Sequence, residues 1–126
     1  MVSRSRVYDI GLALLGVLAL VLKGRINDPF VLSYGGNIAA SFSTFFILKL
    51  PAIPSIYQVA AAVALALLAT ELFEATNGFG FMSNTYDPAD YIANAAGVGL
   101  AALVNMAVQF ASRHRRSPNG SSGAAN

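Results

Sequence analysis

Hydrophobic residues gather into four long runs, separated by short connections rich in polar residues, glycine and proline. The runs cover about residues 7–22, 29–50, 53–75 and 90–112. A helix that crosses a bilayer needs about 20 mostly apolar residues, and the last three runs are long enough. The pattern predicts an all-α fold, a polytopic membrane bundle of four transmembrane helices within residues 1–116.

Composition narrows the possible chemistry. The chain is 56% hydrophobic and 11% charged, whereas a soluble domain carries about 25% charged residues. It has no cysteine, which excludes disulfides and thiolate metal sites. Its one histidine, His114, lies in a basic stretch, which disfavours a Ser-His-Asp triad or a histidine-based metal site. We therefore predict no catalytic residue, cofactor, metal or nucleic-acid partner.

Both ends of the chain differ from the predicted bundle. The first run is short, and Arg4 and Arg6 before residues 10–22 also fit a signal peptide. A small-x-small cleavage site does not follow, so we favour an uncleaved helix and keep the signal peptide as the alternative. Residues 117–126 are rich in Ser, Gly, Asn and Ala, and this composition predicts a disordered tail.

The basic residues predict how the bundle is oriented. With the N-terminus inside the cell, the opposite side holds two basic residues, Lys23 and Arg25. This imbalance follows the positive-inside rule and predicts that both termini are cytoplasmic. The basic residues on the predicted cytoplasmic side are Arg4, Arg6, Lys49, Arg113, Arg115 and Arg116.

One face of the fourth run is small and polar. Its members recur every three or four residues, so they lie on one side of a helix. Such residues let membrane helices approach closely, and we predict helix packing at the inner three, with Asn105 as a hydrogen-bonding partner. The five members of this face are Asp90, Asn94, Gly97, Ala101 and Asn105.

Carboxylates gather where the third run ends and the fourth begins. Glu71 and Glu74 end the third run, on a stripe that continues from Ala60 and Ala64. Carboxylates at the edge of the hydrocarbon are costly, so they indicate a function. If the third and fourth helices face each other, the carboxylates need a proton, a cation, or Lys23 and Arg25 as counter-ions. The candidate ligand-binding residues are Glu71, Glu74, Asp87, Asp90 and Asn94.

Part of this pattern also has a purely structural interpretation. Asp28-Pro29 and Asp87-Pro88 each fit an acidic N-cap followed by proline at the first helical position. Asp87 is better explained as a cap than as a ligand. Within the second run, Asn37 and Ser41 lie one turn apart and extend the polar interior, although buried serines often bond to their own backbone.

The spacing of these polar residues resembles that of VanZ-like membrane proteins. That family carries a glutamate and a glutamine three apart, then an Arg-x-x-Asp-x-x-Asp-x-x-x-Asn-x-x-Gly stretch. The resemblance covers about residues 68–105, with Glu71-x-x-Glu74 and then Asp87, Asp90, Asn94 and Gly97. Glu74 replaces the glutamine and Asn84 replaces the arginine. Our hypothesis is that Arg25 or Lys23 supplies the missing positive charge.

The resemblance implies a protein of the bacterial cytoplasmic (inner) membrane, linked to the cell envelope. Some family members are associated with reduced susceptibility to glycopeptide antibiotics. The first hypothesis is therefore an outward acidic and amide pocket that binds an envelope component or a cationic group. One alternative is a structural or accessory subunit of a larger membrane complex, and another is a proton- or cation-coupled carrier. Besides the lipid bilayer, expected partners are a membrane protein or further copies of the chain.

Overall fold

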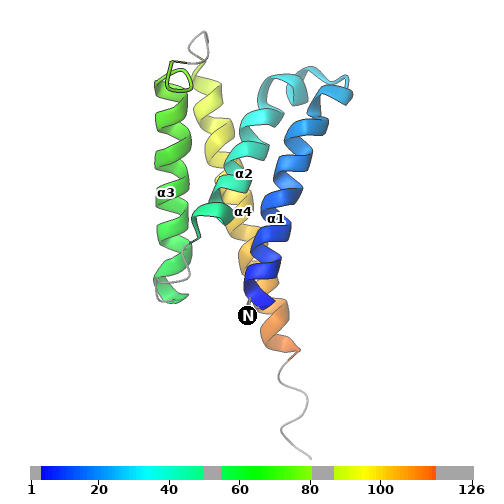
Figure 1. The fold of residues 1–126 in the computed structure, drawn as a ribbon, viewed down its shortest axis with the longest axis vertical. Helices are drawn as coiled ribbons and strands as arrows, with labels where there is room; N and C mark the ends of the chain where they lie inside the picture. Colours follow the sequence, from blue (N-terminus) through cyan, green and yellow to red (C-terminus); the bar gives the residue numbers. More distant parts are fainter. Residues whose placement is uncertain (1–3, 50–54, 81–86, 116–126) are drawn as a thin grey trace, which may run out of the picture.

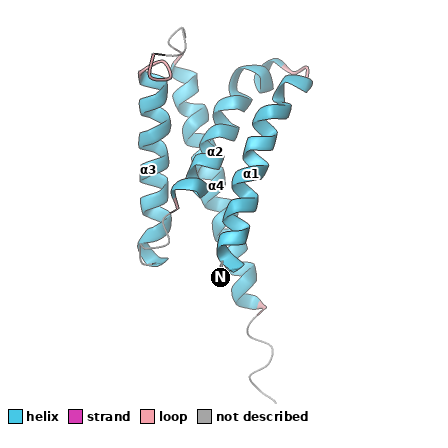
Figure 2. Cartoon of the chain, in the orientation of Figure 1, coloured by secondary structure: helices cyan, strands magenta, loops and turns pink. Residues whose placement is uncertain are grey.

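The computed structural model describes residues 4–49, 55–80 and 87–115, and within them the fold is all-α. Four long helices are formed: α1 (Arg4–Leu22), α2 (Gly36–Leu48), α3 (Ser55–Ala75) and α4 (Pro88–His114). Two short helical turns, η1 (Lys23–Arg25) and η2 (Val31–Gly35), join α1 to α2 (Figure 2). With η2 added to α2, all four helices in the described ranges are long and apolar enough to cross a membrane.

Helix α2 lies at the centre of the bundle. It packs against α1, α3 and α4, while α1 and α3 lie on opposite sides of it (Figure 1). Helix α4 runs behind α2 and contacts both α2 and α3. Helices α1 and α3 consequently leave most of their apolar surface outside the bundle, where lipid covers it in a membrane.

The hydrophobic core forms where the centres of α2, α3 and α4 meet. Three phenylalanines of α2, Phe42, Phe45 and Phe46, belong to it, and the Phe46 ring packs at an angle against the rings of the other two. Ala62 and Ala66 of α3 pack against them. These alanines correct one prediction, because Ala60 and Ala64, expected on the packing stripe, are exposed. The face of α3 that carries Ala62 and Ala66 is the one turned inward.

Two glycines allow the neighbouring helices to approach α2 closely. Gly97 of α4 lies against the Ser41 hydroxyl and the Ile38 carbonyl of α2. Gly16 of α1 lies against Ser43, whose hydroxyl donates to the Ala13 carbonyl at 2.9 Å. Small residues at such contacts are the usual means of close packing between membrane helices. Helix α2 is thus in close contact with α1 through Gly16 and with α4 through Gly97.

The start of the second span is irregular. The Asp28 carboxylate accepts from the backbone N–H groups of Phe30 and Val31 at 2.9 and 3.1 Å, which confirms the predicted cap. The backbone then forms a π-helical turn over η2 before the regular α2 begins at Gly36. Such turns often change the direction of a helix. Here the turn itself contains Tyr34, and it directly precedes the first residues of α2, which include Asn37.

A polar layer crosses the bundle where α2 ends. The Lys49 ammonium forms an ion pair with Asp9 of α1 at 2.9 Å and donates to Asn105 Oδ1 of α4 at 2.8 Å. The Lys49 side chain is only 7% exposed, so a charge inside the bundle is matched by its partner. A lysine is also well placed at the C-terminus of α2, where it faces the negative end of the helix dipole.

Candidate acidic site at the start of α4

Asp87 positions the beginning of α4. Its backbone is extended, its carboxylate accepts from the Ala89 N–H at 2.9 Å, and Pro88 follows as the first helical residue. This geometry confirms the predicted N-cap. The second carboxylate oxygen lies 3.5 Å from the Tyr34 hydroxyl of η2. Asp87 therefore serves as a cap and also joins η2 to α4.

Asp90, one turn further along α4, lies between two other helices. Its Oδ1 accepts from the Asn37 amide of α2 at 2.8 Å. Its carboxylate also lies close enough to the carboxylate of Glu74 from α3 for the two charges to repel each other. A cation placed near two neighbouring carboxylates relieves this repulsion. No described basic side chain forms an ion pair with either carboxylate.

Glu71 and Asn94 form the next contact deeper in the bundle. The Asn94 side chain, which is only 4% exposed, lies beside the Glu71 carboxylate. One oxygen of that carboxylate, Oε2, is buried and has no partner among the described residues. An unsatisfied buried carboxylate oxygen is costly, which makes it a natural acceptor for a bound donor.

The five predicted ligand-binding residues therefore meet at one end of the bundle. We name the carboxylates Glu71, Glu74, Asp87 and Asp90 the acidic cluster, with Asn94 at its inner edge. The structure adds Tyr34 and Asn37 to its border. The helical spacing between Asn37 and Ser41 had indicated that Asn37 faces the polar interior. No feature of the sequence indicated that Tyr34 lies next to Asp87. Ser41 itself donates to the Asn37 carbonyl at 2.6 Å, as expected for a buried serine.

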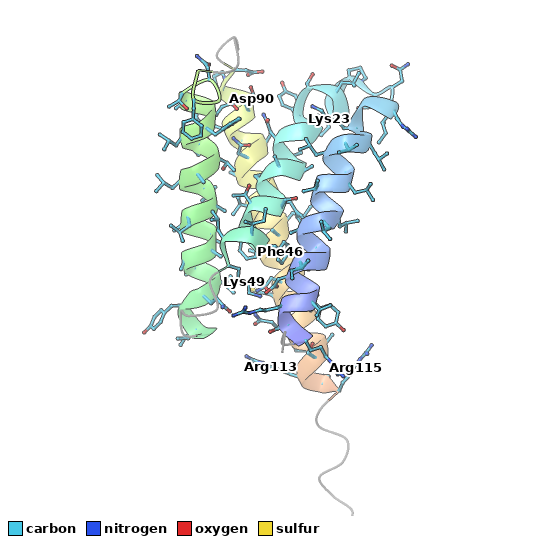
Figure 3. All side chains as sticks on the ribbon, in the orientation of Figure 1. Lys23, Phe46, Lys49, Asp90, Arg113 and Arg115 are labelled. Carbon is cyan, nitrogen blue, oxygen red and sulfur yellow. The ribbon has the colours of Figure 1, made fainter. Side chains whose placement is uncertain are left out.

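The proposed counter-ions lie at the same end but do not pair with these carboxylates. Figure 3 shows Lys23 and Asp90 at one end of the bundle. The Lys23 side chain lies against Gly36. Arg25 is exposed. Within the described part of the chain, neither residue forms an ion pair with the acidic cluster. Asn84, which stands where VanZ-like proteins carry arginine, lies outside the described residues.

The predicted packing residues on α4 are all buried. Gly97 contacts α2, Ala101 belongs to the hydrophobic core, and Asn105 receives the Lys49 hydrogen bond. In the connection after α3, the ring of Phe79 is exposed and packs against Phe73. Phe79 also has a positive φ of 57°, which is unusual for a bulky residue. Residues 81–86, which follow in this connection, lie outside the described ranges.

The arrangement of the carboxylates limits what they hold. Among the described residues, no three acidic or histidine side chains converge closely enough to hold a metal ion. The oxygens are instead spread in pairs over α3 and α4 and suit a ligand with several N–H donors. No family model, curated protein or solved structure matches the chain. The candidate site is therefore supported by the geometry of its residues alone.

Proposed function

We propose that this multi-pass membrane protein binds a cationic group of an envelope component at the acidic cluster. The observation that carries the proposal is the contact between Glu74 and Asp90, with no described basic side chain to neutralise it. A ligand ammonium or guanidinium placed there replaces the missing counter-ion, and Glu71, one turn earlier on α3, adds a further carboxylate beside it with an unsatisfied oxygen.

Chemistry and position together support an organic cation as the ligand. Primary ammonium and guanidinium groups carry several donors, which match carboxylate oxygens spread over two helices. The acidic cluster lies at the end of the bundle opposite to Lys49, Arg113 and Arg115 (Figure 3). The positive-inside rule predicts this end on the outer face, where the VanZ-like resemblance and its link to glycopeptide susceptibility also suggest an envelope role.

The test is native mass spectrometry of the full chain, purified in mild detergent and titrated with lysyl-phosphatidylglycerol. Phosphatidylglycerol, which lacks the amines, serves as the reference lipid. We expect the aminoacylated lipid to bind more tightly, and Glu74→Gln to weaken it about tenfold, as for loss of one charge-assisted contact. Lipids and proteins that co-purify are identified in the same spectra.

Asp28→Asn is the matched control, because it removes one negative charge at the same end, while asparagine retains the helix cap. We expect it to leave binding within about twofold, since Asp28 lies outside the cluster and exposed charges are screened. Equal binding of both lipids, or equal losses in the two variants, would refute the proposal. A stoichiometric protein partner that protects the cluster would support the accessory-subunit alternative.

The same contact favours a second candidate, a proton-coupled carrier. A proton is another species that relieves the repulsion between Glu74 and Asp90, and a site that exchanges one cation for another is the core of such a carrier. This candidate predicts pH-driven flux across liposomes that Glu74→Gln stops. Flux that Glu74→Gln does not alter would exclude it, without bearing on ligand binding.

A further inference from the structure

A cavity of about 520 Å³ lies at the opposite end of the bundle from the acidic cluster. The first turns of α1 and the last turns of α4 form its walls, and Lys49 at the end of α2 lies at its base. Its volume is in the range of small-molecule sites. No described residue of α3 lines it, so the cavity is separate from the acidic cluster.

The base of the cavity contains a buried donor without a partner. Asn105 lines the cavity and is only 3% exposed. Because the Lys49 ammonium can only donate, the Asn105 oxygen has to face it, and this fixes the orientation of the amide. The remaining group, Nδ2, is a buried donor with no partner among the described residues. A ligand that satisfies it supplies an acceptor oxygen.

The cavity walls are positively charged. Arg4 of α1 and Arg113 and Arg115 of α4 line it, and none of them forms an ion pair with a described residue. The one acidic side chain in the lining, Asp9, is already neutralised by Lys49. Lys49 itself has three donors, of which Asp9 and Asn105 take two. The cavity thus offers donors and positive charge, without a free carboxylate to repel an anion.

A role in membrane orientation explains only part of this arrangement. Basic residues in the last turn of α4 suit the helix dipole and the positive-inside rule. Neither effect requires Arg4, from the other end of the chain, to share a cavity with them. Arg6, two residues further along α1, satisfies the same rule without lining the cavity. The unpartnered amide of Asn105 has no part in orientation at all.

We propose that this cavity binds a phosphate group, carried by an anionic lipid headgroup or by a soluble phosphate compound. The phosphate oxygens accept from Asn105 Nδ2 at the base and pair with Arg4, Arg113 and Arg115 at the walls. Arginine is well suited to this, because its planar fork matches two phosphate oxygens. The cavity lies at the end of the bundle, where phosphate groups of a bilayer are found.

The test uses the full chain in mild detergent and native mass spectrometry with short-chain phosphatidic acid as the probe. Diacylglycerol of the same chain length, which lacks the phosphate, is the reference. We expect Arg4→Gln to weaken phosphatidic acid binding about tenfold, while the matched variant Arg6→Gln stays within about twofold. Asn105→Asp, which keeps an acceptor for Lys49 but replaces the free donor by a carboxylate, is expected to abolish binding.

Competition with inorganic phosphate distinguishes the two sources. Displacement of the lipid by phosphate supports a soluble phosphate compound, whereas resistance to displacement supports a lipid headgroup. Equal weakening by Arg4→Gln and Arg6→Gln, or equal retention of diacylglycerol, would overturn the proposal. Because Asn105 is buried, that variant is interpreted only if its thermal midpoint is retained. If the thermal midpoint of that variant falls, the comparison of Arg4→Gln with Arg6→Gln still decides the test, because both arginines are exposed.

Discussion

The hydroxyl oxygen of Ser41 lies against the α-carbon of Gly97 and fills the space that any larger side chain at position 97 requires. The carbonyl oxygen of Ile38 closes the same space from the backbone, which has little freedom to retreat. This contact holds α2 and α4 together midway between the acidic cluster and the Lys49 layer. The close approach therefore positions the residues at both ends of α4.

Gly97→Ala is expected to destabilise the bundle by about 1–3 kcal/mol, the usual range for overpacking of a tight contact. Gly99→Ala is the control, because nothing lies within 4 Å of a Cβ at Gly99. There alanine is expected to be neutral or to stabilise the helix by up to about 1 kcal/mol. Unfolding in detergent, followed by circular dichroism, measures both. Similar stabilities of the two variants would contradict the close contact.

Gly16 and Ser43 are expected to be energetically coupled across α1 and α2. Gly16→Ala places a methyl group against Ser43, whereas Gly11→Ala meets no atom within 4 Å. In a double-mutant cycle, Ser43→Ala should reduce the cost of Gly16→Ala by about 1 kcal/mol, because the obstructing oxygen is gone. Unfolding free energies of the four proteins give the coupling, and a value of zero would show that the hydroxyl yields without cost.

Lys49→Met is expected to destabilise the protein by about 3 kcal/mol, because it leaves the carboxylate of Asp9 without its counter-ion in a largely buried position. Adding Asp9→Asn should restore part of the loss by removing that charge. Arg25→Met is the control, since Arg25 is exposed and pairs with no described residue. If the single Lys49 variant matched Arg25→Met in its thermal midpoint, the ion pair would contribute nothing to stability.

Asp87→Ala is expected to cost about 1 kcal/mol, because the first turn of α4 loses its cap. Asp87→Asn retains an oxygen for the Ala89 N–H and should preserve most of that stability. Hydrogen exchange at the start of α4 separates a local effect from global unfolding. Faster exchange in the asparagine variant, equal to that in the alanine variant, would mean that the charge of Asp87 matters more than its cap.

The four helices follow from hydrophobic run length and from caps, which are local features of the sequence. Asp28-Pro29 and Asp87-Pro88 marked two helix starts because the cap hydrogen bonds join residues close in the chain. The run length also gave the ends of α3 and α4 within a few residues. Helix α1 starts earlier than expected, at Arg4, since a helix end can carry charged residues beyond the apolar run.

Contacts between helices were harder to predict, because they depend on the rotation of each helix. The inward face of α3 carries Ala62 and Ala66, and an apolar helix surrounded by lipid gives no polar face by which to recognise this. Lys49 was interpreted as a marker of orientation at the helix end. Its burial with Asp9 and Asn105 joins residues 40 and 56 positions apart, which no local pattern reports.

Helix α2 stops at Leu48, whereas α4 continues to His114. At a rise of about 1.5 Å per residue, the 18 residues of the second span measure about 27 Å and the 27 residues of α4 about 40 Å. Because Lys49 meets Asn105 where α2 ends, the last turns of α4 extend beyond the end of α2. For the phosphate group proposed above, a two-tailed lipid would arrive at this end of α4 by lateral diffusion within its own leaflet, whereas a soluble compound would enter from the water past Arg4, Arg113 and Arg115.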